Sequence, residues 1–584
     1  MALKLRGIHR ACLWGILLIL SITLLAFPTR LTLEYYDMQS TRIFDNLPLF
    51  AGLFCIWLAA LLILLFSRHN KRENEWEKLA FVCVFSAVFI GFWTILTFNL
   101  GRGEGIFNDA HVKYLNQFGK IPIGNRVLSY FDFPGLHIIG SFVSQVIGLD
   151  PIRSASTILF VQTVLFAALL YVLFRRFISN ASIASLAVLI VIQGNIWISK
   201  LNIFHPRNLG LFLLVTFIVI ISRQGKGLFR TIPDIIIILI VTAATTVTHF
   251  VTSYLIFFIM VGIYIIKIRS KDNSESVSTL VIFIVLPLSW ALYWAILMFG
   301  GTIQYVFSAL QTWISKGDTL WTILMSLQAN VGGIMSIWSN LSRLFWWILI
   351  YGLGSLLWLR NLFKIKQLPY IEKIVTGIMF GIVVVSILSI IGSNGGERFD
   401  SYLLYGALTA TPILLWFLLC LKASIRNYVL CGFLLIFFIL SFPTFLTNNN
   451  MIEQAIFYPD EHAAGQFLAQ QSNIPGIFLL EPETKFIINY YDYTKDFYSG
   501  VPAIVQMKDE DGLWENVKKT YSSFITWQNE TNNSVVFLLT KRSTLYYEHF
   551  LRVKPDNPNW LELKENLSYQ NQIYENRNIQ MFIR

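Results

Sequence analysis

HIIGSFVSQVIGL, residues His137–Leu149, is the stretch of sequence that decides how the rest of the chain is arranged. It is apolar, but its 13 residues fall short of the roughly 20 that a helix needs to cross the hydrocarbon core of a bilayer. We therefore predict a helix that lies in the membrane interface. This choice matters because counting the stretch as a span would move every later loop to the opposite side of the membrane.

Longer apolar runs occupy most of the first 445 residues. Hydrophobic residues make up 55% of the 584-residue chain and charged residues only 14%, with a mean hydropathy of +0.59. A water-soluble fold of this length cannot bury so many apolar side chains, so a bilayer must act as solvent. We expect about 13 transmembrane helices, near 12–27, 48–66, 79–98, 155–174, 181–199, 208–222, 234–249, 251–267, 278–299, 340–359, 371–392, 403–421 and 427–445.

Clusters of basic residues fix the orientation of these helices. Cytoplasmic loops of membrane proteins are enriched in Lys and Arg. With His137–Leu149 in the interface, five clusters fall on the same side as the basic N-terminus: Arg175 and Arg176; Arg223, Lys226 and Arg230; Lys267, Arg269 and Lys271; Arg360, Lys364, Lys366 and Lys373; Lys422 and Arg426. The N-terminus is therefore predicted to be cytoplasmic.

The chain is predicted to hold two domains. Residues 1–445 form an all-α polytopic membrane domain, with a large outer loop at 99–154 that contains juxtamembrane helices and a further outer loop at 300–339. Residues 446–584 are much more polar; AAGQFLAQQ predicts an amphipathic helix, whereas GIFLLEP and SVVFLLT predict short buried strands. We expect a small extracytoplasmic α/β domain there.

Net charge and the positions of the cysteines argue against nucleic-acid binding and against a site built from cysteines. The net charge of +11 comes largely from the loops that orient the helices, where it also favours anionic lipid headgroups, so we do not expect a nucleic-acid partner. All five cysteines lie in apolar runs. The cysteines therefore predict neither a disulfide framework nor a metal site.

The long outer loop holds the strongest candidate for a catalytic residue. In FNDAHVKYLNQF, residues 107–118, Asp109 precedes His111 and Lys113, which are candidate substrate-binding residues. A short helix starting at Asn108 or Asp109 is expected. One hypothesis is that Asp109 is the N-cap of that helix, a position that favours aspartate. The other is that Asp109 is a general base, which takes a proton from an acceptor hydroxyl while nearby cations hold a phosphate leaving group.

Further polar residues, each a candidate for binding the substrate, are expected on the same outer side. Asp132 and His137 flank the turn Phe133-Pro134-Gly135, where a structural role is the simpler interpretation. His205 and Arg207 lie in the loop SKLNIFHPRN, and His249 lies between two closely spaced apolar runs. An ionisable group is costly at bilayer depth, so we expect His249 at the outer surface or facing a cavity.

The last outer loop, GERFDSYLLYG, contributes a candidate phosphate ligand. Arg398 keeps its charge at any physiological pH and can bind a phosphate through two parallel hydrogen bonds. A surface ion pair with Glu397 or Asp400 is the alternative. Asp109, His205, His249 and Arg398 come from four loops that share one predicted side.

In organisation the chain resembles the GT-C superfamily of membrane glycosyltransferases, including the dolichyl-phosphate-mannose-protein mannosyltransferases. The loop with NDAH, the FPGLH segment and HIIGSFVSQVIGL are similar to the first outer loop of that family, and GERFDSYLLYGALTATPILL is similar to its late Arg-bearing segment. The resemblance implies Asp109 as catalytic base and Arg398 as a contact to the lipid-linked phosphate. His111 and His249 would be neighbours in the same cavity.

The expected function is an inverting sugar transfer on the extracytoplasmic side, from a polyprenyl-phosphate-linked donor to a hydroxyl of a glycan, lipid or protein. A transporter or flippase of a lipid-linked or anionic solute is the alternative, and a ligase or polymerase of surface polysaccharide is a third class. We expect the plasma membrane of a prokaryote. No cofactor is predicted from the residues, and a divalent cation is left open because several GT-C subfamilies carry a paired acidic motif.

Overall fold

The computed structural model describes separate parts of the chain. They are residues 75–96, 104–121, 133–178, 180–193, 203–223, 232–269, 277–293, 354–364, 366 and 368–392, and, toward the C-terminus, 459–470, 476–479, 484–491, 496–499, 535–540, 558, 561–562, 565, 571–576 and 579–583. The first two expected spans, the outer loop 300–339 and the expected spans 403–421 and 427–445 lie outside the described residues.

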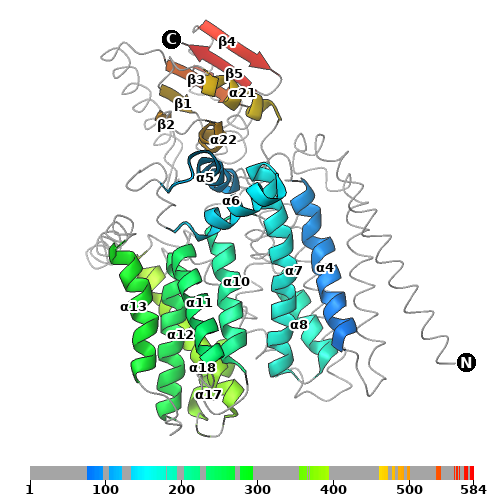
Figure 1. Cartoon of the computed structure of the whole chain (residues 1–584), viewed down its shortest axis with the longest axis vertical. Helices are drawn as coiled ribbons and strands as arrows, with labels where there is room; N and C mark the ends of the chain where they lie inside the picture. Colours follow the sequence, from blue (N-terminus) through cyan, green and yellow to red (C-terminus); the bar gives the residue numbers. More distant parts are fainter. Residues whose placement is uncertain are drawn as a thin grey trace, which may run out of the picture.

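Helices form a bundle in which most members run side by side (Figure 1). They are α4 (Glu75–Leu96), α7 (Pro151–Phe177), α8 (Ala181–Gln193), α10 (Pro206–Ile221), α11 (Ile232–Thr248), α12 (Phe250–Arg269), α13 (Val277–Tyr293), α17 (Gly354–Phe363) and α18 (Tyr370–Gly392). Each of these helices corresponds to an apolar run expected to span the membrane, except that α17 overlaps only part of the run 340–359. The mostly helical fold is thus confirmed, whereas the total of about 13 spans stays a prediction.

Close packing between α12 and α18 depends on glycine. A Cβ atom at Gly377 would lie 2.7 Å from the Cα atom of Ile263, and one at Gly381 would lie 2.7 Å from the Cα atom of Ile259. Small residues spaced four apart let two helix backbones approach each other in this way, as they commonly do inside membranes.

Several helices turn apolar side chains outward. Among the described residues, α7 and the Val251–Arg269 part of α12 are long and apolar enough to cross a membrane. Exposed large apolar side chains on α7, α11 and α13 include Val161, Leu165, Ile236, Ile240, Val285 and Leu292. Such a surface is costly in water and inexpensive in lipid, which supports a membrane protein.

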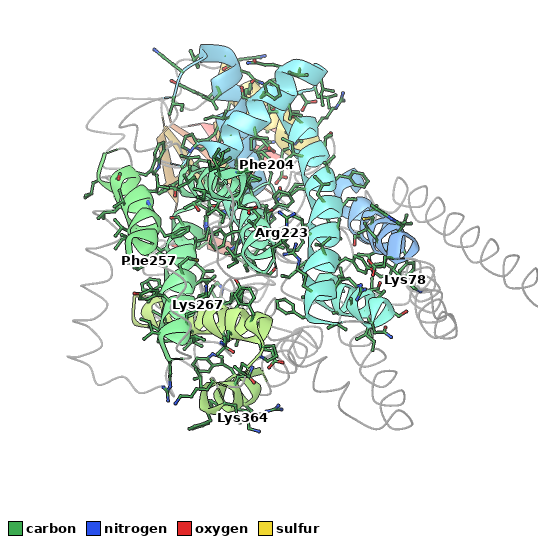
Figure 2. The ribbon with its side chains drawn as sticks, turned by 60° about the horizontal axis from the view of Figure 1, so that its bottom comes forward. Lys78, Phe204, Arg223, Phe257, Lys267 and Lys364 are labelled. Carbon is green, nitrogen blue, oxygen red and sulfur yellow. The ribbon has the colours of Figure 1, made fainter. Side chains whose placement is uncertain are left out.

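Basic residues gather at one end of the bundle. At the end of α7, Arg176 donates a hydrogen bond to the Ser222 hydroxyl beyond α10 at 2.7 Å. The Lys267 ammonium at the end of α12 lies 5.6 Å from the centroid of the Tyr370 ring at the start of α18. Figure 2 turns this end forward and labels Lys78, Arg223, Lys267 and Lys364. Which end faces the cytoplasm stays a prediction.

The opposite end of the bundle carries α5 (Glu104–Phe118) and α6 (Gly135–Ile147), and a sheet lies beyond them (Figure 1). The sheet contains β1 (Gly476–Leu479), β2 (Asp496–Ser499), β3 (Val535–Thr540), β4 (Asn571–Asn576) and β5 (Ile579–Ile583) in the order β2-β1-β3-β5-β4. The pairs β1–β2 and β1–β3 are parallel, whereas β3–β5 and β4–β5 are antiparallel. The helices α21 (Pro459–Gln470) and α22 (Thr484–Tyr491) pack against each other, and α22 lies between the sheet and α5 (Figure 1).

Candidate active site

Helix α5 carries the candidate base in its second turn. The helix starts at Glu104 and ends before Gly119, which adopts a φ of +63° and donates its N–H to the Leu115 carbonyl at 2.9 Å. The expectation that Asp109 is the N-cap is therefore wrong. The helix extends further back because it packs on the bundle: Ile106 is fully buried, and a Cβ atom at Gly105 would lie 3.3 Å from the Phe204 nitrogen.

Helix α6 is polar on its inward face and apolar on its outward face, a pattern that agrees with the predicted interfacial helix. Its inward face is mostly small or polar: apart from Leu136, the buried residues are Gly135, His137, Gly140, Ser141 and Ser144. Its outward face is apolar, with Ile138, Ile139, Phe142, Val146 and Ile147 exposed. Outward apolar groups on a helix that crosses the top of a bundle are suited to the boundary between headgroups and acyl chains.

Polar contacts join α6 to α5. The Asn116 side chain accepts a hydrogen bond from the Ser141 hydroxyl at 2.6 Å and donates one to the Ser144 hydroxyl at 2.9 Å. A Cβ atom at Gly140 would lie 2.6 Å from Cγ2 of Val112. The two helices are therefore held at close approach, and the side chains between them have little room to move.

Asp109 is buried without a hydrogen-bond partner for one of its carboxylate oxygens. The residue is 2% exposed, and its Oδ1 atom has no hydrogen-bond partner among the residues that the structure describes. Burial, helped by the nearby negative charge of Asp150, raises the pKa of Asp109 well above its ordinary value. A carboxylate held in this way is a stronger base than one in water, and the unpartnered oxygen can accept a proton from a ligand hydroxyl.

Two histidines form a stacked pair between α5 and α6. The His111 and His137 rings lie 4.8 Å apart between centroids, with 22° between their planes, and both residues are fully buried. The Nδ1–H of His111 donates to the Phe107 carbonyl at 2.7 Å, and the Nε2–H of His137 donates to the Asn108 amide oxygen at 3.0 Å. These acceptors fix the tautomers and leave the lone pairs on His111 Nε2 and His137 Nδ1.

Both rings are neutral at physiological pH. Burial lowers the pKa of His111 to about 4, against the opposing effect of its bond to Phe107. Burial lowers the pKa of His137 well below its ordinary value, and the neighbouring His111 lowers it further. The pair therefore offers lone pairs and polar N–H groups without adding positive charge beside α5.

His205 and His249 lie at the same end of the bundle, on helices below α6. His205 is the N-cap of α10, where its Nδ1 accepts from the Arg207 backbone N–H at 3.1 Å. His249 joins α11 to α12, and its Nδ1 lies 2.7 Å from the Thr252 hydroxyl. A Cβ atom at Gly210 would lie 2.9 Å from the His249 Cβ, so α10 and this junction are in close contact.

A cavity opens beside this junction. It has a volume of about 270 Å³ and is lined by Ala243, Thr246 and Val247 of α11 and by Leu286, Ser289 and Trp290 of α13. Its lining is mainly apolar, and Val247 lies directly before the Thr248-His249 junction. The cavity is therefore suited to a hydrocarbon group held next to the polar end of the bundle.

The remaining predicted site residues differ in their placement. Lys113 is directed away from the bundle toward α22, where its ammonium donates to the Tyr490 carbonyl at 2.9 Å. Asp132 and Arg398 lie outside the described residues. Asp109 and His111 are two residues apart on α5 and so project from different faces of the helix. Among the described residues, no group of three or more His, Cys, Asp or Glu side chains could hold a metal ion.

Two residues of this region were not predicted from the sequence to belong to the site. Asn108 fixes the tautomer of His137, and Asp150 both raises the pKa of Asp109 and caps α7 by accepting from the Arg153 N–H at 3.2 Å. The Asp-Pro pair at 150–151 is a typical helix start, but that pattern gives no indication of a nearby buried carboxylate.

Comparisons with known proteins bear on the fold. No family model and no curated protein sequence matches the chain. The archaeal oligosaccharyltransferase AglB from Archaeoglobus fulgidus, in complex with an inhibitory peptide and a dolichol-phosphate, is similar with a TM-score of 0.51 and 12% identity, over 85% of this chain and 73% of AglB. ArnT from Cupriavidus metallidurans in the apo state gives a TM-score of 0.49 and 11% identity, over 86% of this chain and 98% of ArnT.

At 12% identity, the similarity to AglB shows the fold and leaves the activity to be argued from the residues. The shared part covers most of both chains. The resemblance to the GT-C glycosyltransferases that the sequence indicates is thus confirmed at the level of the fold.

Proposed function

We propose that the chain is a membrane glycosyltransferase that transfers a sugar from a polyprenyl-phosphate-linked donor to an acceptor hydroxyl on the extracytoplasmic side. The observation that carries the proposal is the buried Asp109 carboxylate, whose Oδ1 has no hydrogen-bond partner in the described part of the chain. Leaving a buried charged group without a partner is costly, and such groups occur mainly where a ligand completes the site.

In the proposed reaction Asp109 is the general base. The acceptor hydroxyl gives its proton to the Asp109 carboxylate while the acceptor oxygen bonds to the anomeric carbon of the sugar. The bond between that carbon and the phosphate oxygen breaks, and the lipid phosphate leaves with the electron pair. Attack opposite the leaving group inverts the anomeric configuration. The raised pKa of Asp109 agrees with this role, because a carboxylate with a raised pKa is a stronger base.

The donor would lie with its lipid chain in the bundle and its phosphate at the polar end. The cavity between α11 and α13 offers an apolar lining next to His249. Arg207 at the start of α10 and Arg398 are the proposed phosphate ligands, because a guanidinium keeps its charge and forms paired hydrogen bonds. AglB has the same fold and holds a dolichol-phosphate, which agrees with a donor of this chemical class.

The first test compares the wild-type chain with Asp109→Asn in nanodiscs, using a panel of radiolabelled polyprenyl-phosphate sugars. We expect the variant to insert normally and to lose turnover by about 100-fold or more, the size typical of removing a general base. Undiminished turnover in Asp109→Asn would exclude Asp109 as the base.

Asp150→Asn is the matched control. Asparagine caps a helix as well as aspartate does, so α7 should keep its start. Removing the charge of Asp150 lowers the pKa of Asp109, so the acid limb of the pH–rate profile should move to lower pH while the maximal rate is retained. An assay of solute flux across proteoliposomes tests the transporter alternative. A transporter should carry the solute across the membrane without transferring any sugar, and Asp109→Asn should change that flux.

A further inference from the structure

Lys113 joins α5 to the C-terminal part of the chain. It lies one helical turn after Asp109, and its ammonium donates a hydrogen bond to the Tyr490 carbonyl at 2.9 Å. The same ammonium lies 4.6 Å from the centroid of the Tyr490 ring and 4.9 Å from that of Tyr491. Figure 1 shows α5 between α22 and the bundle.

The end of α22 is well suited to a cation. The last carbonyl groups of a helix have no partner within the helix and carry partial negative charge. Tyr490 and Tyr491 are the last two residues of α22, and their rings meet at 89° with centroids 5.1 Å apart. Lys113 therefore meets the negative helix end and two aromatic rings together, an arrangement that attracts an ammonium group.

The tyrosines are in turn fixed to the helix behind them. The Tyr491 hydroxyl lies 3.1 Å from Nδ1 of His462 on α21, and a Cβ atom at Gly465 would lie 2.9 Å from Cδ2 of Tyr491. The contacts thus run without interruption from α5 through Lys113 and α22 to α21. Burial lowers the pKa of Lys113, as expected for an ammonium enclosed by neighbouring groups rather than left in water.

We propose that Lys113 is a positioning residue through which α22 holds α5, and with it Asp109, in place for the reaction. The catalytic half of this statement rests on the proposed function of Asp109. The sequence offered Lys113 as a substrate contact, but its hydrogen bond and both ring contacts are made to α22. The C-terminal part of the chain is thereby assigned a role: it fixes the helix that carries the base.

The experiment uses the full-length chain in nanodiscs with three variants. Lys113→Met keeps the length of the side chain and removes the ammonium. Lys113→Arg keeps a cation that can bind both the carbonyl and the rings. Lys120→Met is the matched control, because Lys120 is an exposed lysine just beyond α5. Hydrogen exchange of the amides in α5 and α22 is measured together with kcat and KM for the lipid-linked donor.

We expect Lys113→Met to speed exchange in both α5 and α22 by about tenfold and to lower kcat by about tenfold, with KM for the donor changed less than about twofold. Lys113→Arg should keep the exchange rates and kcat close to those of the wild-type chain, and Lys120→Met should match the wild-type chain in both. Unchanged exchange in Lys113→Met overturns the contact as a restraint. Faster exchange with an unchanged kcat, or a rise in KM alone, overturns the positioning role. Should Asp109→Asn keep full turnover, the proposed base fails, and the exchange data still decide whether Lys113 holds α5.

Discussion

Acidification should weaken the fold through His111, and the size of the effect follows from its burial. The pKa of the buried ring is about 4, against 6.5 for an ordinary histidine, because burial disfavours the charged form. The unfolded chain therefore takes up a proton first as the pH falls below about 6.5, and the folded chain follows only near 4. Each pKa unit corresponds to about 1.4 kcal/mol. Protonation of His111 in the unfolded chain should therefore lower the free energy of unfolding by about 3 kcal/mol as the pH falls from about 6.5 to about 4.

His111→Phe isolates this contribution. A phenyl ring can keep the stacking on His137 and the edge contact with Phe107 but cannot take up a proton. The free energy of unfolding is measured by equilibrium denaturation in mixed micelles at pH 7.5, 5.5 and 4. The wild-type chain should lose about 3 kcal/mol more than the variant between the first and last of these. Parallel pH dependence in the two proteins would refute the reasoning, since His137 and all other titrating groups are common to both.

Two further substitutions test how much the buried Asp109 carboxylate destabilises the fold and how closely α6 packs at Gly135. Asp109→Asn should raise the melting temperature at pH 7.5, because burial raises the pKa of Asp109 and so disfavours the ionised carboxylate that the unfolded chain carries at this pH, at a cost of about 1–3 kcal/mol. The gain should shrink as the pH falls toward 4, where the carboxyl of the unfolded chain also takes up a proton. Gly135→Ala should destabilise the fold by about 1–3 kcal/mol, since the new Cβ atom would lie 2.4 Å from the Thr248 hydroxyl and 3.1 Å from the Val247 carbonyl. Gly119→Asn is its control, because no atom lies within 4 Å of a Cβ there and asparagine tolerates the φ of +63°; equal melting temperatures for these two glycine variants would contradict the packing argument.

Local pattern was enough to predict α6 and the helices of the bundle. The stretch His137–Leu149 is too short to span and alternates apolar with small polar residues at helical spacing, and the observed helix begins at Gly135 and ends at Ile147. The helix AAGQFLAQQ and the strands GIFLLEP and SVVFLLT likewise correspond to α21, β1 and β3. In each case one periodic pattern within a short window determines the element.

Contacts between distant segments could not be predicted in the same way. Lys113 and Tyr490 are 377 residues apart, and nothing in the residues around Lys113 indicates an aromatic partner. The start of α5 was misplaced because Asn108 and Asp109 are typical N-cap residues, whereas packing of Ile106 and Gly105 against the bundle extends the helix by a turn. Tertiary packing outweighs local propensity here, as it often does at helix ends.

The placement of ionisable groups bears on the choice between an enzyme and a transporter. A transporter is expected to bind its solute near the bilayer midplane, between broken or charged helix segments. Among the described residues of the bundle and of α5 and α6, the buried Lys, Asp and His side chains lie toward the two ends of the bundle, with Lys78 and Lys267 at one end and Asp109, His111, His137 and His205 at the other. The interior of α11 has buried threonines instead, and Thr245 and Thr246 donate their hydroxyls to carbonyl groups one turn earlier. Ionisable side chains that avoid the middle of the bundle and collect near α6 favour chemistry at one end of the bundle over passage through it.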